Sequence, residues 1–315
     1  MEIWVGIAGG LGAALCWAAG SLLFSRIRVP AAGLNLFKNG FGSLLLIACL
    51  VAVALYRGGP VLQYEPSGWA WLAASSVTGL LIGDTLYFRS IQILGPRRGL
   101  VLALSVPPMA ALLSWMLLGE SPGGTWVGMG VTLLGVGWVI VQRGRADEEP
   151  GLYPGTAWVG VMCGLGAAAC QAIGSVWSKQ GLRGDAFPGL APSGALPELD
   201  ASLIRLFVAF AIGIVFYARS LRVWWPSIRE SLPVLGIASF LGTFLGIWLS
   251  LIAYGNAPLS VATTLTSLTP VFVIPMVRIF LGTRVSWGAV LGVVIAVLGV
   301  VLLVFSTEEF ARVSR

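Results

Sequence analysis

The chain has 315 residues, of which 57% are hydrophobic and only 10% are charged, and its mean hydropathy is +0.91. These values lie far from those of soluble globular domains, so we expect an integral membrane protein. The net charge of +6 does not indicate a nucleic-acid partner, because the basic residues are scattered in ones and twos at the ends of apolar segments.

Ten apolar segments are long enough to cross a bilayer as helices of about 20 residues. In chain order they cover residues 4–25, 33–55, 69–93, 99–118, 124–142, 156–178, 202–219, 231–254, 259–281 and 286–305. They are about twice as long as a membrane strand and show no two-residue alternation, which excludes a barrel. The expected fold class is therefore an all-α polytopic membrane protein with ten transmembrane helices.

The first and sixth segments are nearly the same sequence, since residues 4–21 recur at 158–175. Further matches share one constant offset and pair Gly79 with Gly242, Gly83 with Gly246, Pro107 with Pro270, and Leu118-Gly119 with Leu281-Gly282. We therefore expect two repeats, 1–145 and 154–306, followed by a short tail, 307–315. Because each repeat has five spans, the second enters the membrane from the opposite face, and such inverted repeats are typical of secondary transporters.

The charges between the spans favour termini outside the cell. The connections after odd-numbered spans carry more arginines than the opposite set, which includes Arg57, Lys179 and Arg183. Positively charged loops usually face the cytoplasm.

The region around the fourth span of each half resembles a known family. It reads LGPRRGLVLALSVPPMAALLSWMLLGE in the first half and GNAPLSVATTLTSLTPVFVIPMVRIFLGT in the second. Both resemble the EamA-type repeat of the drug/metabolite transporter superfamily, whose fourth helix carries a mid-span proline and ends in Leu-Gly-Glu. Trp17 matches the tryptophan near the middle of that family's first helix.

The resemblance covers essentially the whole chain. It implies a multi-pass protein of the cell (plasma or inner) membrane that transports small organic molecules, often as an exporter, through a central cavity lined mainly by helices 1, 3, 4, 6, 8 and 9. The second repeat departs from the pattern, with Thr283 in place of Glu120 and Gln171 in place of Trp17. Family members commonly have cytoplasmic termini, contrary to the loop charges, so the orientation stays open.

Asp84 is the one carboxylate deep inside a predicted span, and Tyr87 lies one turn later on the same helix face. An ionisable residue at that depth is a candidate for substrate binding or proton coupling. The alternative is an ion pair with Arg89 or Lys38 that only fixes helix packing. The equivalent of Asp84 in the second repeat is Ile247, so any such chemistry belongs to one half.

Lys38 and Arg205 occupy similar positions in the second and seventh spans. Either both extend to the membrane surface, or they form a pair that attracts an anionic substrate such as a carboxylate or phosphate.

Three prolines lie near the middle of the fourth and ninth spans, where they remove backbone hydrogen bonds and bend the helix. They are Pro107, Pro108 and Pro270. Broken helices at matched positions indicate a binding region, although helix packing alone also explains them.

Trp17, Gln171 and Trp248 lie deep in their spans and are further candidates for substrate contact beside Tyr87. Most other tryptophans lie near span ends, as expected for residues of the membrane interface.

These features favour a secondary transporter that exports small polar or amphipathic metabolites by alternating access. No Gly-x-x-x-x-Gly-Lys-Ser/Thr motif is present, so the energy must come from a gradient, and Asp84 is the candidate for proton coupling. A flippase of a lipid-linked substrate is the alternative. A membrane-embedded enzyme is disfavoured, because the chain has no histidine. We expect no cofactor or metal, a bilayer environment, a small-molecule substrate, no nucleic acid, and a monomer or homodimer.

Overall fold

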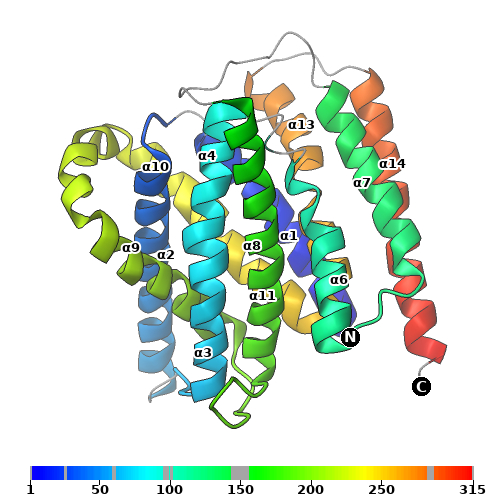
Figure 1. Cartoon of the computed structure of the whole chain (residues 1–315), viewed down its shortest axis with the longest axis horizontal. Helices are drawn as coiled ribbons and strands as arrows, with labels where there is room; N and C mark the ends of the chain where they lie inside the picture. Colours follow the sequence, from blue (N-terminus) through cyan, green and yellow to red (C-terminus); the bar gives the residue numbers. More distant parts are fainter. Residues whose placement is uncertain are drawn as a thin grey trace.

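The computed structural model describes residues 2–24, 27–58, 62–94, 99, 102–142, 156–281 and 287–313. These residues form long helices packed side by side (Figure 1), without a β-strand among them. All ten predicted spans are present, some as single helices and some as successive helical segments. The prediction of an all-α polytopic fold is therefore confirmed.

The first half contains five spans. They are α1 (Glu2–Phe24), α2 (Ala31–Arg57), the series α3 (Pro66–Ser75), η1 (Ser76–Gly83) and α4 (Asp84–Leu94), then α6 (Val106–Leu118) and α7 (Thr125–Gln142). The second half repeats this order. Its spans are α8 (Ala157–Arg183), α9 (Glu198–Glu230), the series α10 (Leu232–Ser239), η2 (Phe240–Leu245) and α11 (Gly246–Asn256), the pair α12 (Leu259–Thr266) and α13 (Thr269–Leu281), and α14 (Trp287–Val313).

The two halves run in opposite directions. In Figure 1, α1 starts at the lower edge, where the N-terminus lies, whereas α8 starts at the upper edge and ends at the lower one. We call the lower edge the terminal side, because both chain ends lie there. The inverted arrangement follows from the odd number of spans in each half.

Two helix ends differ from the prediction. The seventh span was expected at 202–219, but α9 extends to Glu230, and residues 307–313, expected as a tail, continue α14. The end of α9 is amphipathic: Leu221, Trp224 and Ile228 pack into a core with the connection between α1 and α2. Its arginines Arg219, Arg222 and Arg229 are exposed. Burial of one face keeps this segment helical beyond the apolar run.

The third and eighth spans contain matched π-helical segments. In a π-helix the hydrogen bonds reach five residues along the chain, which widens the turn and is frequent at functional sites. Segment η1 contains Gly79 and Gly83, and segment η2, together with the first residue of α11, contains Gly242 and Gly246. The repeated glycines therefore mark a repeated irregularity of the backbone.

The fourth and ninth spans are interrupted, although not as predicted. In the fourth span, a turn at Ser105 precedes α6, and Pro107 and Pro108 lie in the first turn of that helix. The ninth span is interrupted between α12 and α13, and Pro270 lies in the first turn of α13. A proline in the first turn removes no helical hydrogen bond. The helix break expected at these prolines is therefore present, but the prolines begin a new helical segment and do not bend a continuous one.

Glycines bring the two halves close together. Helix α1 of the first half packs on η2 and α11 of the second, while α8 of the second half packs on η1 and α4 of the first. Helices α7 and α14 pair through close contacts of Gly128 with Leu303 and of Gly135 with Ala296. Small residues allow this approach between helix backbones in a membrane protein.

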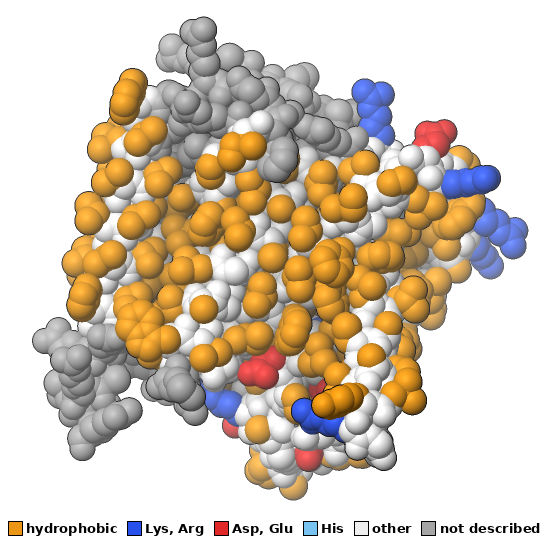
Figure 2. Space-filling model, turned by 180° about the vertical axis from the view of Figure 1, so that it is seen from behind, with side chains coloured by type: hydrophobic (Ala, Val, Ile, Leu, Met, Phe, Trp, Pro, Cys, Tyr) orange, Lys and Arg blue, Asp and Glu red, His pale blue; other side chains and the backbone are white. Residues whose placement is uncertain are grey.

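The surface agrees with a membrane environment. Figure 2 shows a broad apolar face, with charged side chains gathered near the upper and lower ends of the molecule. Five described spans are long and apolar enough to cross a bilayer individually: Ile3–Phe24, Ala31–Arg57, Ala157–Arg183, Glu198–Glu230 and Leu232–Asn256.

Candidate functional site

A buried polar cluster joins the two halves at Asp84. The Lys38 Nζ atom of α2 lies 2.6 Å from Asp84 Oδ2, and Gln171 Nε2 of α8 donates to Asp84 Oδ1 at 2.6 Å. The side chains of Lys38 and Asp84 are only 6% and 16% exposed. Both carboxylate oxygens of Asp84 therefore have a partner, one from each half of the molecule.

The π segment places Asp84 at this junction. Asp84 is the first residue of α4, and its backbone N–H donates to the carbonyl of Gly79, five residues earlier. Gln171 Nε2 donates to the same carbonyl at 3.1 Å. One amide side chain of the second half therefore binds both the irregular backbone of η1 and the carboxylate that follows it.

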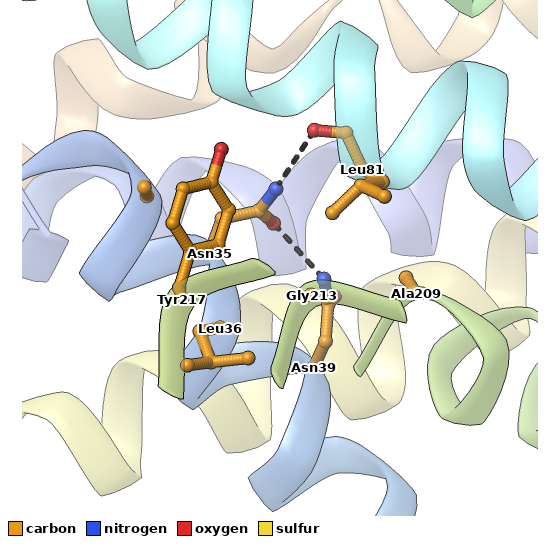
Figure 3. Close-up of a pocket in the computed structure, with 8 residues that line it drawn as sticks. Asn35, Leu36, Asn39, Leu81, Ala209, Gly213 and Tyr217 are labelled. Carbon is orange, nitrogen blue, oxygen red and sulfur yellow. Dashed lines mark hydrogen bonds between the residues drawn. The ribbon is translucent and has the colours of Figure 1, made fainter. Parts of the chain in front are cut away.

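A second amide satisfies other carbonyls of η1. Asn35 Nδ2 of α2 donates to the carbonyl oxygen of Leu80 at 2.7 Å and to Thr85 Oγ1 at 3.0 Å. Asn39 Nδ2 donates to Asn35 Oδ1 at 3.0 Å. Figure 3 shows the two asparagines in a crevice between α2 and α9, with Asn35 also directed at the carbonyl of Leu81. Such partners are required because lipid tails offer no hydrogen-bonding group to a backbone carbonyl inside the membrane.

The sequence reasoning missed both asparagines. Asn35, Lys38 and Asn39 are spaced i, i+3 and i+4, which places three polar residues on one face of an otherwise apolar helix. That spacing was the available signal.

Arg205 lies beside this cluster. Its side chain is buried, with the residue 4% exposed, and its Nη2 atom lies next to Gly79. Its backbone carbonyl accepts a hydrogen bond from Ser76 of η1. Asp84 and Tyr254 are close enough to the guanidinium to interact with it electrostatically. We use the name central cluster for Lys38, Asp84, Gln171 and Arg205.

The structure excludes a surface-directed position for the two cations. Neither Lys38 nor Arg205 extends to the surface, because they are 5% and 4% exposed. Of the two ion-pair partners considered for Asp84, Lys38 is in contact. Arg89 is exposed, and no ion pair joins it to Asp84 in the described part of the chain.

The three aromatic candidates for substrate contact lie in two different regions of the structure. Tyr87 is partly buried and close enough to Asp84 to interact with it electrostatically. Trp17 packs on Gly246, where an added Cβ would lie 2.5 Å from the indole Nε1. The Trp248 ring lies near Phe244, at 6.3 Å between centroids. Trp17 and Trp248 therefore belong to the region of η2 and α11, whereas Tyr87 belongs to the central cluster.

The three prolines lie at helix starts, apart from the polar contacts described for the central cluster. Pro107, Pro108 and Pro270 begin α6 and α13, and none of the described hydrogen bonds or ion pairs joins α6 or α13 to the central cluster.

A second charged cluster lies on the terminal side. Glu120 Oε1, just after α6, lies 2.8 Å from Lys179 Nζ and also binds Arg183, both on α8. Glu120 Oε2 accepts a hydrogen bond from the backbone N–H of Leu259 at 3.0 Å. Lys179, expected as a loop charge, is instead 3% exposed and also donates to the carbonyl of Ala257. We call Glu120, Lys179 and Arg183 the terminal cluster.

The terminal cluster borders a cavity of about 370 Å³. The cavity is lined by Gly119, Glu120, Ser121, Pro122, Thr125, Lys179, Arg183, Pro258 and Ser260. It therefore combines hydroxyl groups with two cations and one carboxylate at the end of the molecule where α6, α8 and α12 meet.

The sequence is similar to a known family, and the fold is similar to a solved structure. The model of the EamA-like transporter family matches residues 4–141 and 158–305, which are the two repeats. A solved structure titled "Crystal structure of protein" superimposes with a TM-score of 0.75 and 17% sequence identity, covering 97% of this chain and 98% of the other. At that identity the similarity shows the fold alone. No curated protein matches the sequence.

Proposed function

Because the chain belongs to the EamA-like transporter family, which matches it in both repeats, we propose that it is a secondary transporter that exports small polar or amphipathic metabolites by alternating access. Membership in the family means a membrane transporter that acts on a small molecule. The direction, the mechanism and the roles of the residues are our proposal. We place substrate binding and coupling at the central cluster.

The contact of Asp84 with both halves carries this proposal. Lys38 reaches the carboxylate from the same half, and Gln171 reaches it from the other half. When two inverted halves rock against each other, a contact between them at the centre must change while a contact within one half can persist. The hydrogen bond between Gln171 and Asp84 is therefore one of the contacts that alternating access would break.

The same geometry supports our proposal of proton coupling. A proton on Asp84 removes the charge that pairs with Lys38 and leaves a buried ammonium group without its carboxylate. An uncompensated buried charge costs about 3–5 kcal/mol, so protonation or substrate binding at this site changes the balance between conformations. Tyr87 is proposed to contact substrate beside the cluster, and Trp17 and Trp248 to contact it from the region of η2 and α11.

Transport in proteoliposomes tests the proposal. The compound is first found by screening purified protein for ligands that raise its thermal stability, and an imposed pH gradient should then drive its uptake. We expect Asp84→Asn to fold normally and to lose the dependence on the pH gradient. The matched control is Arg89→Gln, which removes an exposed charge from the same helix and should transport as the wild type does. Unchanged coupling in Asp84→Asn would remove this residue from the mechanism.

A further inference from the structure

Arg205 is a buried cation without a carboxylate partner. In the described part of the chain, no ion pair reaches its guanidinium, and its buried Nε atom has no hydrogen-bond partner. Positions one helical turn away on α9 hold Ala201, Ser202, Val208 and Ala209, so its own helix offers no acid. A buried guanidinium normally has a paired anion, because removing its charge from water without compensation is unfavourable.

The acidic residues at the start of α9 are bound elsewhere. Glu198 Oε1 accepts a hydrogen bond from Asn256 Nδ2, and Asp200 Oδ2 accepts one from the backbone N–H of Gln63. Asp84 interacts electrostatically with Arg205, but its two carboxylate oxygens already bind Lys38 and Gln171. The central cluster thus holds two cations and one carboxylate and carries a net charge of +1.

The terminal cluster repeats this charge balance. Its cavity is lined by Lys179, Arg183 and Glu120, again two cations and one carboxylate. Lys179 follows Gln171 on α8 by about 12 Å along the helix axis. The two clusters therefore lie at two levels of the same helix, and each carries one more cation than carboxylates. Two successive sites of one sign concentrate solutes of the opposite sign.

We propose that the transported compound is an organic anion and that Arg205 binds its carboxylate group. The inference rests on the proposed transport function and assigns its substrate class. A monocarboxylate brings the charge of the central cluster to zero. The planar guanidinium offers paired N–H groups that match the two oxygens of a carboxylate. Arg205 is then a substrate-binding residue, and Asp84 keeps Lys38 from competing for the same anion.

Thermal unfolding of the purified full-length protein tests this assignment. The probes are sodium salts of monocarboxylic acids of increasing size, from acetate through pyruvate to benzoate, each compared with its neutral amide. We expect the acids to raise the melting temperature of the wild type and the amides to leave it unchanged. If no acid stabilises the wild type more than its amide does, the assignment is wrong.

Two variants on one helix complete the test. In Arg205→Gln the affinity for the acids should fall by about 30-fold or more, and Arg205→Lys should retain part of it. The matched control, Arg219→Gln, removes an exposed arginine of α9 and should bind as the wild type does. Equal binding by Arg205→Gln and wild type would overturn the proposal. Should Arg205→Gln not fold, the comparison of acids with amides on the wild type still decides.

The binding assay separates this proposal from the transport function. Acids that bind through Arg205 but are not transported in proteoliposomes would contradict the function and leave the anion site intact. Gradient-driven transport of a neutral or cationic compound, unchanged in Arg205→Gln, would support the function and overturn the anion assignment.

Discussion

The repeat produces two helix crossings with the same geometry. Helix α8 crosses η1 where Gly174 meets Gly79, and α1 crosses η2 where Gly20 meets Gly242. An added Cβ would lie 3.1 Å from the opposite Cα atom in the first crossing and 2.8 Å in the second. Both crossings join one half to the other, and both require glycine. The close approach therefore belongs to the scaffold that the copies share.

The same two crossings differ in chemistry. Gln171 faces Gly83 in one, and Trp17 occupies the equivalent place against Gly246 in the other. Asp84 of the first crossing corresponds to Ile247, which is buried in an apolar cluster. The backbone is duplicated, whereas the carboxylate and the amide donor occur in one copy, and the equivalent cations Lys38 and Arg205 both lie beside that carboxylate. This difference locates the proposed coupling chemistry in the crossing of α8 with η1.

The largest expected effect comes from breaking the buried pair. Lys38→Met leaves the Asp84 carboxylate without its cation and should lower the free energy of unfolding by about 3–5 kcal/mol. The double variant Lys38→Met/Asp84→Leu should lose less free energy of unfolding than the sum of the losses in the two single variants, because it removes both charges together. Reversible unfolding in mixed detergent measures these differences.

The control for this experiment lies in the other copy. Ile247→Val removes one methyl group from the equivalent position and should cost about 0.5–1.5 kcal/mol. Strictly additive losses in the double variant would contradict a coupled pair at the first crossing.

A smaller and equal effect is expected at the two glycine contacts. Gly20→Ala and Gly174→Ala should each reduce the free energy of unfolding by about 1–3 kcal/mol, because the new methyl group meets backbone atoms of the opposite helix. The control is Gly130→Ala in α7, where no atom lies within 4 Å of an added Cβ. Losses no larger than that of Gly130→Ala would show that the crossings are not closely packed.

The sequence predicted the scaffold better than its irregularities. The spans and the repeat follow from apolar length and from identities such as those at Gly79 and Gly242, because these depend on local composition. Asp84, Lys38 and Gln171 could be named as candidates because polar groups are unusual at that depth. Their mutual contacts could not, since they depend on how α2, α4 and α8 pack.

Other features were misread for definable reasons. Arg89 follows Asp84 by five residues, about 140° around a helix, so the spacing already opposed their pairing. The π segments have no sequence signature beyond their glycines, and the need for Asn35 to satisfy their carbonyls appears only in the structure. Pro107 and Pro108 correctly marked an interruption of the fourth span, but the sequence did not show that the turn lies before them, at Ser105.

The smallest expected effect concerns Glu120, whose counterpart Thr283 lies outside the described residues. Its partner Arg183 has a side chain that is 42% exposed, so Arg183→Gln should cost at most about 1 kcal/mol. The loss should shrink in high salt, because exposed pairs are screened. Arg222→Gln, an exposed arginine of α9, serves as the control. A loss that does not respond to salt would contradict a surface ion pair.

The central claim is that one crossing carries the charged coupling chemistry and the other does not. Its most direct test compares gradient-driven transport by Asp84→Asn and Ile247→Leu, replacements of similar volume at equivalent positions of the two repeats, in proteoliposomes with equal amounts of folded protein. We predict that Asp84→Asn abolishes the response to the pH gradient and that Ile247→Leu preserves it. Equal responses in the two variants, or a loss confined to Ile247→Leu, would contradict the account.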